Sequence, residues 1–228
     1  MPRRARIAPG GYVYHVLNRT VARLAMFEKD ADYLAFERIL AEALEKHPTR
    51  LLAYTLMPNH WHLVLWPRED GELTEFVRWL THTHVMRWHA HFGTSGSGHL
   101  YQGRFKSFPV ETDHYLLSLL RYVERNARRA NLVERAEEWR WSSLWRRMSG
   151  DRAAQALLHR WPVPQPRDWA RLVNRPQSAA EEQAIRQAIR RGAPFGATQW
   201  QIRTAQLLGL DWTLNPRGRP RKRKEDVP

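Results

Sequence analysis

The pattern of apolar and polar positions in the first half of the chain predicts alternating strands and helices. Short runs rich in β-branched and aromatic residues are typical of β-strands. These strands are expected at residues 11–18, 51–57, 60–66 and 104–111. Apolar residues that recur every three or four positions are typical of α-helices. These helices are expected at residues 30–47, 72–92 and 113–126.

The order of these elements indicates a fold class. Pro58 and Asn59 are a turn signal between two apolar runs, so the second and third strands should form an antiparallel hairpin. The first six elements then follow the order β-α-β-β-α-β, the split β-α-β or ferredoxin-like arrangement. We therefore predict an α+β fold in which an antiparallel sheet carries helices on one face.

The character of the chain changes after about Ser149. Three prolines within 161–166 predict an irregular segment, and helical periodicity returns over 179–191 and 198–208. The stretch 215–224 holds six basic residues and two prolines, and we expect it to be disordered alone. We predict three segments, which are a main domain over 1–149, a mostly helical extension over 150–214 and a basic tail over 215–228.

Charge and composition narrow the choice of partners. The chain has 37 Lys and Arg against 23 Asp and Glu, a net charge of +14, which favours a polyanion such as nucleic acid. Arg supplies 32 of the 37 basic residues, which suits phosphate, although a GC-rich genome would also explain that ratio. No apolar run is long enough for a membrane span or a secretory signal, so we expect a cytoplasmic, nucleoid-associated protein.

Two histidines on the third predicted strand are candidate metal ligands. His60 and His62 are two residues apart, so their side chains share one face, while Trp61 faces the opposite side, where a helix could cover it. Two imidazoles on one face can share a divalent cation, although such a pair also occurs through packing or chance. A competing cluster lies on the second predicted helix and resembles a polar helix surface. Its members are His82, His84, His89 and His91.

A metal that acts on phosphate also needs a nucleophile, and the chain contains no cysteine. Tyr122 and Asn126 are four residues apart on the third predicted helix, which places a hydroxyl beside an amide oxygen able to complete the coordination. Tyr115 faces the same way, but its partner four residues on is Leu119, which cannot bind a metal. The alternative is that Tyr122 only packs in an apolar stripe.

Basic residues surround this candidate nucleophile and recur at both ends of the chain. They could draw in and hold a phosphodiester, although a run of charge is usually a solvated face. The candidate DNA-binding residues are Arg3, Arg4, Arg6, Arg19, Arg104, Lys106, Arg121, Arg125, Arg128, Arg129, Arg217, Arg219, Arg221 and Lys222.

As a set, four motifs resemble the single-tyrosine transposases of the His-hydrophobic-His superfamily, and within it the REP-associated tyrosine transposases. These motifs are Met57–Leu63, Gly98–Ser107, Tyr115–Asn126 and Trp141–Ser143, and the end of the chain, 209–222, also resembles tails in this family. The resemblance covers roughly residues 8–148. It implies that the 1–149 domain is the catalytic one and has the ferredoxin-like fold.

The resemblance also implies roles for individual residues. His60 and His62 would bind Mg²⁺ or Mn²⁺, with Asn126 in the place of a third ligand. Tyr122 would attack single-stranded DNA that carries short REP-like hairpins and would hold its 5′ phosphate. Relatives act as monomers or as homodimers, and the sequence does not choose between them. Ala127 stands where the family commonly has a proline, which puts the fine positioning of Asn126 in question.

Two further functions compete with a cleaving and rejoining enzyme. One is a non-catalytic protein that binds DNA or RNA hairpins through its Arg and Trp side chains. The other is a hydrolase in which water replaces Tyr122 as the nucleophile.

Overall fold

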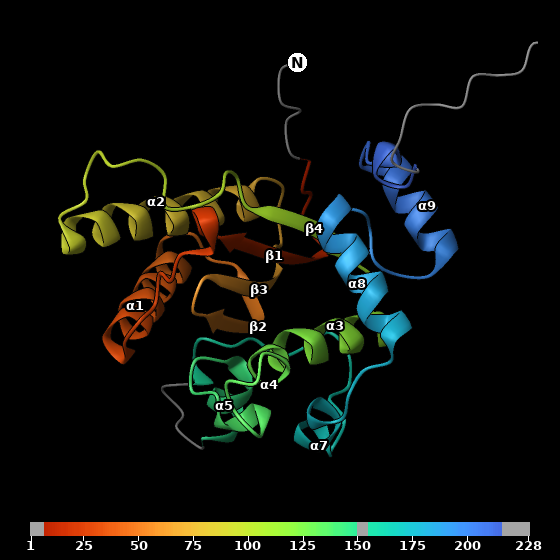
Figure 1. Ribbon diagram of the computed structural model, residues 1–228. Coiled ribbons are helices and arrows are strands. Elements are labelled where there is room, and N and C mark those ends of the chain that lie inside the picture. Colours follow the sequence, from red (N-terminus) through yellow and green to blue (C-terminus); the bar gives the residue numbers. More distant parts are fainter. Residues whose placement is uncertain (1–6, 150–154, 216–228) are drawn as a thin grey trace, which may run out of the picture.

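A computed structural model describes residues 7–149 and 155–215 of the chain (Figure 1). Its centre is a four-stranded sheet with the order β2-β3-β1-β4, in which every neighbouring pair is antiparallel. The strands are β1 (Val13–Arg19), β2 (Arg50–Met57), β3 (His60–Trp66) and β4 (Lys106–Val110). Each lies within two residues of its predicted bounds, and the order is that of the predicted ferredoxin-like unit.

The two long helices of this unit cover one face of the sheet, as predicted. They are α1 (Asp30–Lys46) and α2 (Glu72–Phe92). Phe36 of α1 and Phe76 of α2 share a core with Trp61, which is fully buried on this side of β3. Helices therefore cover Trp61 on the face where the sequence analysis allowed for one. In the described ranges, no helix is long and apolar enough to cross a membrane.

A second group of helices covers the opposite face and lies below the sheet in Figure 1. Its members are α3 (His114–Glu124), α4 (Asn126–Arg129), α5 (Ser143–Met148) and α7 (Trp169–Asn174). Leu116, Leu119 and Leu120 of α3 pack with Val64 and Phe108 of the sheet. The sequence did not reveal α4, α5 and α7, or the 3-10 turns Val21–Arg23, Ala136–Glu138 and Asp211–Thr213, because three to six residues are too few to establish a helical period.

The third predicted helix begins as expected and ends two residues early. Asp113 caps it, because its Oδ1 accepts a hydrogen bond from the Tyr115 backbone N–H at 2.7 Å. Arg125, with ψ of −3°, separates α3 from α4. Glu124 anchors this end, since its buried carboxylate accepts hydrogen bonds from Ser143 Oγ and Trp169 Nε1, both at 2.6 Å.

The extension packs directly onto the main domain. It contains α8 (Ala179–Arg191) and α9 (Thr198–Leu207), which match their predicted bounds to within one residue, and the stretch 161–166 is irregular as predicted. Phe195 bonds to the edge of β4, where it donates to Pro109 O and accepts from Glu111 N, both at 2.9 Å. The division at residue 149 stays a prediction. The tail beyond residue 215 lies outside the described residues.

Candidate active site

His60 and His62 lie on the face of β3 that α3 covers. In the antiparallel register, His62 is opposite Leu17 of β1 and His60 is opposite Arg19. The two imidazole centroids are 5.0 Å apart and their planes differ by 80°. His62 is buried, with 3% of its surface exposed, whereas His60 is partly exposed at the start of the strand. The alternation of β3 therefore gives the two histidines the common face that their spacing predicts.

Both histidines have Nδ1 engaged. His60 Nδ1 is 2.6 Å from Asn59 Oδ1, and His62 Nδ1 is 2.8 Å from Nε2 of His15. In residues 7–149 and 155–215, neither Nε2 atom makes a hydrogen bond. Each ring thus has its second nitrogen available for another contact.

Burial keeps these imidazoles neutral. Desolvation, with a smaller contribution from the positive charges of Arg19 and Arg129, lowers the pKa of His60 to about 4. Desolvation and the neighbouring His15 hold the pKa of His62 well below its usual value. A neutral imidazole is the form that binds a metal ion, so the donor set is in the required protonation state across the physiological pH range.

Tyr122 lies across from the histidines on α3. Its ring centroid is 6.2 Å from that of His62, and the two rings are edge to face at 86°. The Arg129 guanidinium stacks on the Tyr122 ring, with Cζ 4.1 Å from the centroid. No group among the described residues forms a hydrogen bond with the Tyr122 hydroxyl, although 95% of the residue is buried. The hydroxyl is therefore not committed to a structural contact within that part of the chain.

Asn126 is held beside Tyr122 by Arg129. The Asn126 carboxamide is buried, and its Oδ1 accepts a hydrogen bond from Arg129 Nη2 at 2.9 Å. Its Nδ2 has no partner among the residues that the structure describes. Because a carbonyl oxygen has two lone pairs, one remains for a cation. The described residues contain no group of three or more His, Asp or Glu side chains that could hold a metal ion, and the candidate donors that the sequence predicts are the histidine pair and this carboxamide.

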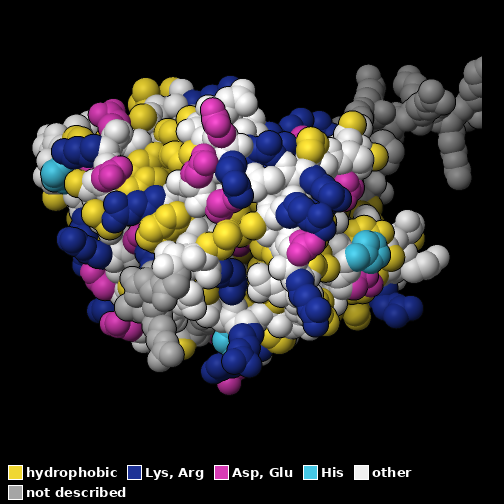
Figure 2. All heavy atoms as spheres, turned by 90° about the horizontal axis from the view of Figure 1, so that it is seen from below, with side chains coloured by type: hydrophobic (Ala, Val, Ile, Leu, Met, Phe, Trp, Pro, Cys, Tyr) yellow, Lys and Arg dark blue, Asp and Glu magenta, His cyan; other side chains and the backbone are white. Residues whose placement is uncertain are grey.

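Several predicted DNA-binding residues border the same face. Arg19 is opposite His60 in the sheet, and Lys106 of β4 is opposite Leu17, which is itself opposite His62. Arg125 and Arg128 line a hollow beside α4, and Arg104 is exposed just before β4. Seen from below (Figure 2), Lys and Arg side chains are spread over the surface among Asp and Glu and do not form one block. The predicted residues outside the described ranges are Arg3, Arg4, Arg6, Arg217, Arg219, Arg221 and Lys222.

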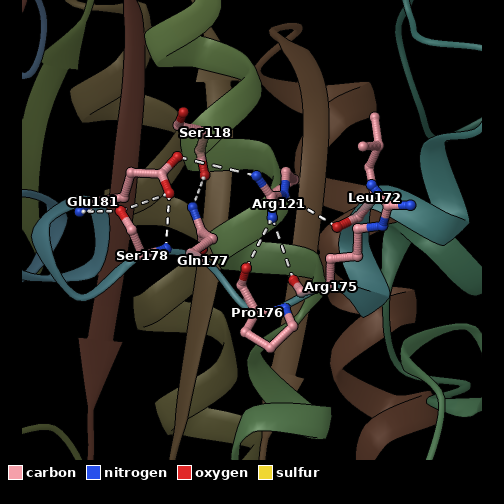
Figure 3. Close-up of polar contacts among 8 residues, drawn as sticks. All are labelled: Ser118, Arg121, Leu172, Arg175, Pro176, Gln177, Ser178 and Glu181. Carbon is pink, nitrogen blue, oxygen red and sulfur yellow. Dashed lines mark hydrogen bonds and ion pairs between the residues drawn. The ribbon is translucent and has the colours of Figure 1, made fainter.

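Arg121 has a different environment, because its guanidinium forms hydrogen bonds and an ion pair with residues of the extension (Figure 3). The guanidinium donates to the backbone carbonyls of Leu172, Arg175 and Pro176 at 3.1, 3.3 and 3.5 Å. It also lies 4.0 Å from the Glu181 carboxylate. Arg121 thus connects the helix that carries Tyr122 to α7, to α8 and to the segment between them. The contact with DNA that its position predicted remains untested.

We expect Arg121→Ala to lower the free energy of unfolding by about 1–3 kcal/mol, because the change removes three hydrogen bonds to backbone carbonyls and an ion pair with Glu181. Thermal unfolding of the full chain would measure the effect. Arg125→Ala is the matched control, since the Arg125 side chain makes no hydrogen bond to the described residues and should leave the melting temperature nearly unchanged. Equal melting temperatures for the two variants would contradict the tethering role.

The competing histidines on α2 do not form a site. His84 is buried on the other face of the sheet, where its Nδ1 is 2.7 Å from the Tyr101 hydroxyl. That hydroxyl also accepts a hydrogen bond from Trp61 Nε1 at 2.9 Å. His89 bonds to Thr94, and the remaining two, His82 and His91, are exposed. His84 is therefore a hydrogen-bonded core residue.

Sequence reasoning missed His15. It is fully buried on β1 and contacts His62. The sequence did contain one indication of its position. Alternation along β1 puts His15 on the same face as Leu17 and Arg19, the residues that lie opposite His62 and His60. The contact with His62 depends on the pairing of β1 with β3, which the periodicity of a single strand does not give.

A family model covers the part of the chain that carries the site. The family model of IS200-like transposases matches residues 10–126, a span that contains His60, His62, Tyr122 and Asn126. The chain belongs to the IS200-like transposase family. This membership makes the protein a transposase-type, DNA-processing enzyme.

Two solved structures are similar to the chain. One is a REP-associated tyrosine transposase bound to a REP hairpin, with 16% identity and a TM-score of 0.49, covering 73% of this chain and 95% of that one. The other is a candidate transposase from Deinococcus radiodurans R1, with 20% identity and a TM-score of 0.39, covering 54% of this chain and 95% of that one. A search of curated proteins finds no match.

Proposed function

We propose that this protein cleaves and rejoins single-stranded DNA through a covalent 5′-phosphotyrosine intermediate on Tyr122. The observation that carries the proposal is the edge-to-face approach of Tyr122 to His62, at 6.2 Å between ring centroids. This approach places the phenol of α3 close to the imidazole pair of β3. The hairpin in the REP-associated structure and the motif resemblance support REP-like hairpins as the substrate class.

The chemistry needs no external energy source. The Tyr122 hydroxyl gives up its proton to solvent as its oxygen attacks the phosphorus, the bond to the 3′ oxygen breaks, and that oxygen takes up a proton from solvent and leaves as a 3′ hydroxyl. One phosphodiester replaces another, so attack by the 3′ hydroxyl of a second strand reverses the step and frees the tyrosine. Arg129, stacked on the ring, restricts the directions in which the phenol can point.

The residues present fit a divalent cation. His60 and His62 would hold Mg²⁺ or Mn²⁺ through Nε2, and Asn126 would add Oδ1. When bound, the ion polarises the phosphoryl oxygen and neutralises charge that develops on it. Arg19 of β1 and Lys106 of β4 lie on the same side of the pair, one and two strands away from β3, and would hold the neighbouring phosphates.

A hairpin-binding protein without cleavage activity is the second candidate. The contact that favours it is the hydrogen bond from the positively charged Arg129 to Asn126 Oδ1, which takes one of the two lone pairs of that oxygen and places a cation beside the donor that a metal would use. In that case the basic residues would still bind DNA, but the tyrosine would be inert. A hydrolase that uses water in place of Tyr122 is the third.

One experiment separates the three. The full-length protein is mixed with 5′- and 3′-labelled single-stranded hairpin DNA and Mn²⁺, and the products are resolved on a denaturing gel. A protein–DNA adduct together with a free 3′ hydroxyl fragment supports the transesterase. Two free fragments without an adduct support the hydrolase, and binding without any cleavage supports the hairpin-binding protein.

We expect removal of residues 215–228 to weaken DNA binding and to flatten its salt dependence. The deleted stretch lies almost entirely outside the described residues, so this prediction rests on its charge. On single strands, each neutralised phosphate contributes about 0.7 to the slope of log affinity against log salt. Binding titrations at several salt concentrations would measure the slope. An unchanged slope would contradict a role for the tail in binding.

A further inference from the structure

His15 is a buried polar group that the proposed mechanism does not use. Its ring lies between His62 and Phe108, with 5.0 Å to each ring centroid, and none of its surface is exposed. Its Nε2 is 2.8 Å from His62 Nδ1, while its own Nδ1 has no partner among the described residues. A neutral imidazole carries one proton and one lone pair on its two nitrogens, so one ring of this contact donates and the other accepts.

The contact between the two imidazoles allows two tautomeric arrangements. In the first, His15 Nε2 donates to His62 Nδ1, and the proton of His62 is then on Nε2, where it blocks metal binding. In the second, His62 Nδ1 donates to His15 Nε2, and His62 Nε2 has a free lone pair. The same hydrogen bond holds the ring of His62 at one angle in both arrangements. A cation near Nε2 favours the second arrangement.

We propose that His15 is a positioning residue that accepts a hydrogen bond from His62 Nδ1 and thereby presents His62 Nε2 to a divalent cation. This inference rests on the metal site of the proposed function. Metal-binding histidines commonly donate their second N–H to a carbonyl, carboxylate or water, which fixes the tautomer and the ring orientation. In this chain a neutral imidazole takes that place.

The second histidine of the pair has an equivalent arrangement. Asn59 Oδ1 can only accept, so His60 Nδ1 donates to it and His60 Nε2 is free. Asn59 is itself fixed, because its Nδ2 donates to Arg23 O at 3.3 Å and its backbone carbonyl accepts from Thr20 N at 3.1 Å. Both candidate ligands therefore have an acceptor on Nδ1, which a role of His15 in packing alone would not require.

The test compares two substitutions of His15 with different hydrogen-bonding capacity. His15→Leu fills the space but cannot accept, whereas His15→Gln has a carboxamide oxygen that can. The first readout is Mn²⁺ affinity of the DNA-free protein, followed by the electron paramagnetic resonance signal of free Mn²⁺. We expect about 10- to 100-fold weaker binding for His15→Leu and near wild-type binding for His15→Gln.

Val13→Ala is the matched control. Val13 is buried on the same face of β1 but makes its contacts in the apolar core, so its truncation reports on core damage without touching His62. We expect it to lower the melting temperature and to leave the Mn²⁺ affinity unchanged. The second readout needs no variant: nitrogen chemical shifts of the wild-type protein loaded with Mg²⁺ should place the proton of His62 on Nδ1 and that of His15 also on Nδ1.

The outcomes distinguish this inference from the function on which it rests. If His15→Leu binds Mn²⁺ as tightly as the wild type, or if the loaded His62 carries its proton on Nε2, the role of His15 is wrong while the metal site stands. If the wild-type protein binds no Mn²⁺ with or without DNA, both fail. Weak binding by His15→Leu with recovery in His15→Gln supports the inference, since a purely structural role would not separate the two.

Discussion

Replacing Tyr122 by Phe should abolish the covalent protein–DNA adduct and lower strand cleavage on the order of 10⁴-fold or more, the scale on which removal of a nucleophile acts in other covalent enzymes. The substitution removes one oxygen and retains the ring on which Arg129 stacks and which faces His62. The fold and the hairpin affinity should therefore be preserved. Cleavage of a labelled hairpin in Mn²⁺ and its binding in a gel-shift assay would measure both.

Tyr115→Phe provides the matched control for this prediction. Tyr115 lies two turns earlier on the same helix, and its ring contacts Phe195 of the extension rather than the histidines. We expect this variant to form the adduct at the wild-type rate. An adduct that persists in Tyr122→Phe and disappears in Tyr115→Phe would show that Tyr115, not Tyr122, is the nucleophile.

Loss of His62 should have the second largest effect. We expect His62→Ala to lower cleavage by on the order of 10³-fold or more at any Mn²⁺ concentration, because one of the two imidazole ligands is gone and the charge on the phosphate is no longer neutralised. Hairpin binding should persist, since it depends on the basic side chains around the site. His60→Ala should behave in the same way.

The burial of His62 requires a second variant and a control. His62→Gln retains more of the side-chain volume, and it should also lose cleavage while it melts close to the wild-type temperature. His82→Ala removes an exposed histidine of α2 and should cleave normally. If both His62 variants fold and cut at the wild-type rate, His60 and His62 do not form a metal site required for the reaction.

Local periodicity was sufficient to predict the sheet and the long helices. Strand alternation placed His60 and His62 on one face and Trp61 on the other, and the structure has them there. The spacing of four placed Tyr122 and Asn126 on one side of a helix, and both are buried and contact Arg129 even though Arg125 interrupts the helix between them. These features depend on residues close together in the sequence.

The features that the sequence did not reveal depend on distant pairs. His15 reaches His62 only because β1 lies beside β3, a register that neither strand specifies alone. Arg121 looked like part of a DNA-binding cluster, and its four contacts come from residues 51 to 60 positions later in the chain. Arg129 was predicted as a basic residue of the same cluster. Its double contact with Tyr122 and Asn126 could not be read from charge.

The identity of the nucleophile is tested most directly by locating the adduct. The protein is reacted with single-stranded hairpin DNA and Mn²⁺, digested with nuclease and trypsin, and examined by mass spectrometry. Trypsin cuts after Arg121 and Arg125, so Tyr122 falls in a peptide that contains no other tyrosine. We predict a nucleotide phosphate on that peptide. An adduct on the peptide that carries Tyr115, or cleaved DNA with no modified peptide, would contradict the assignment.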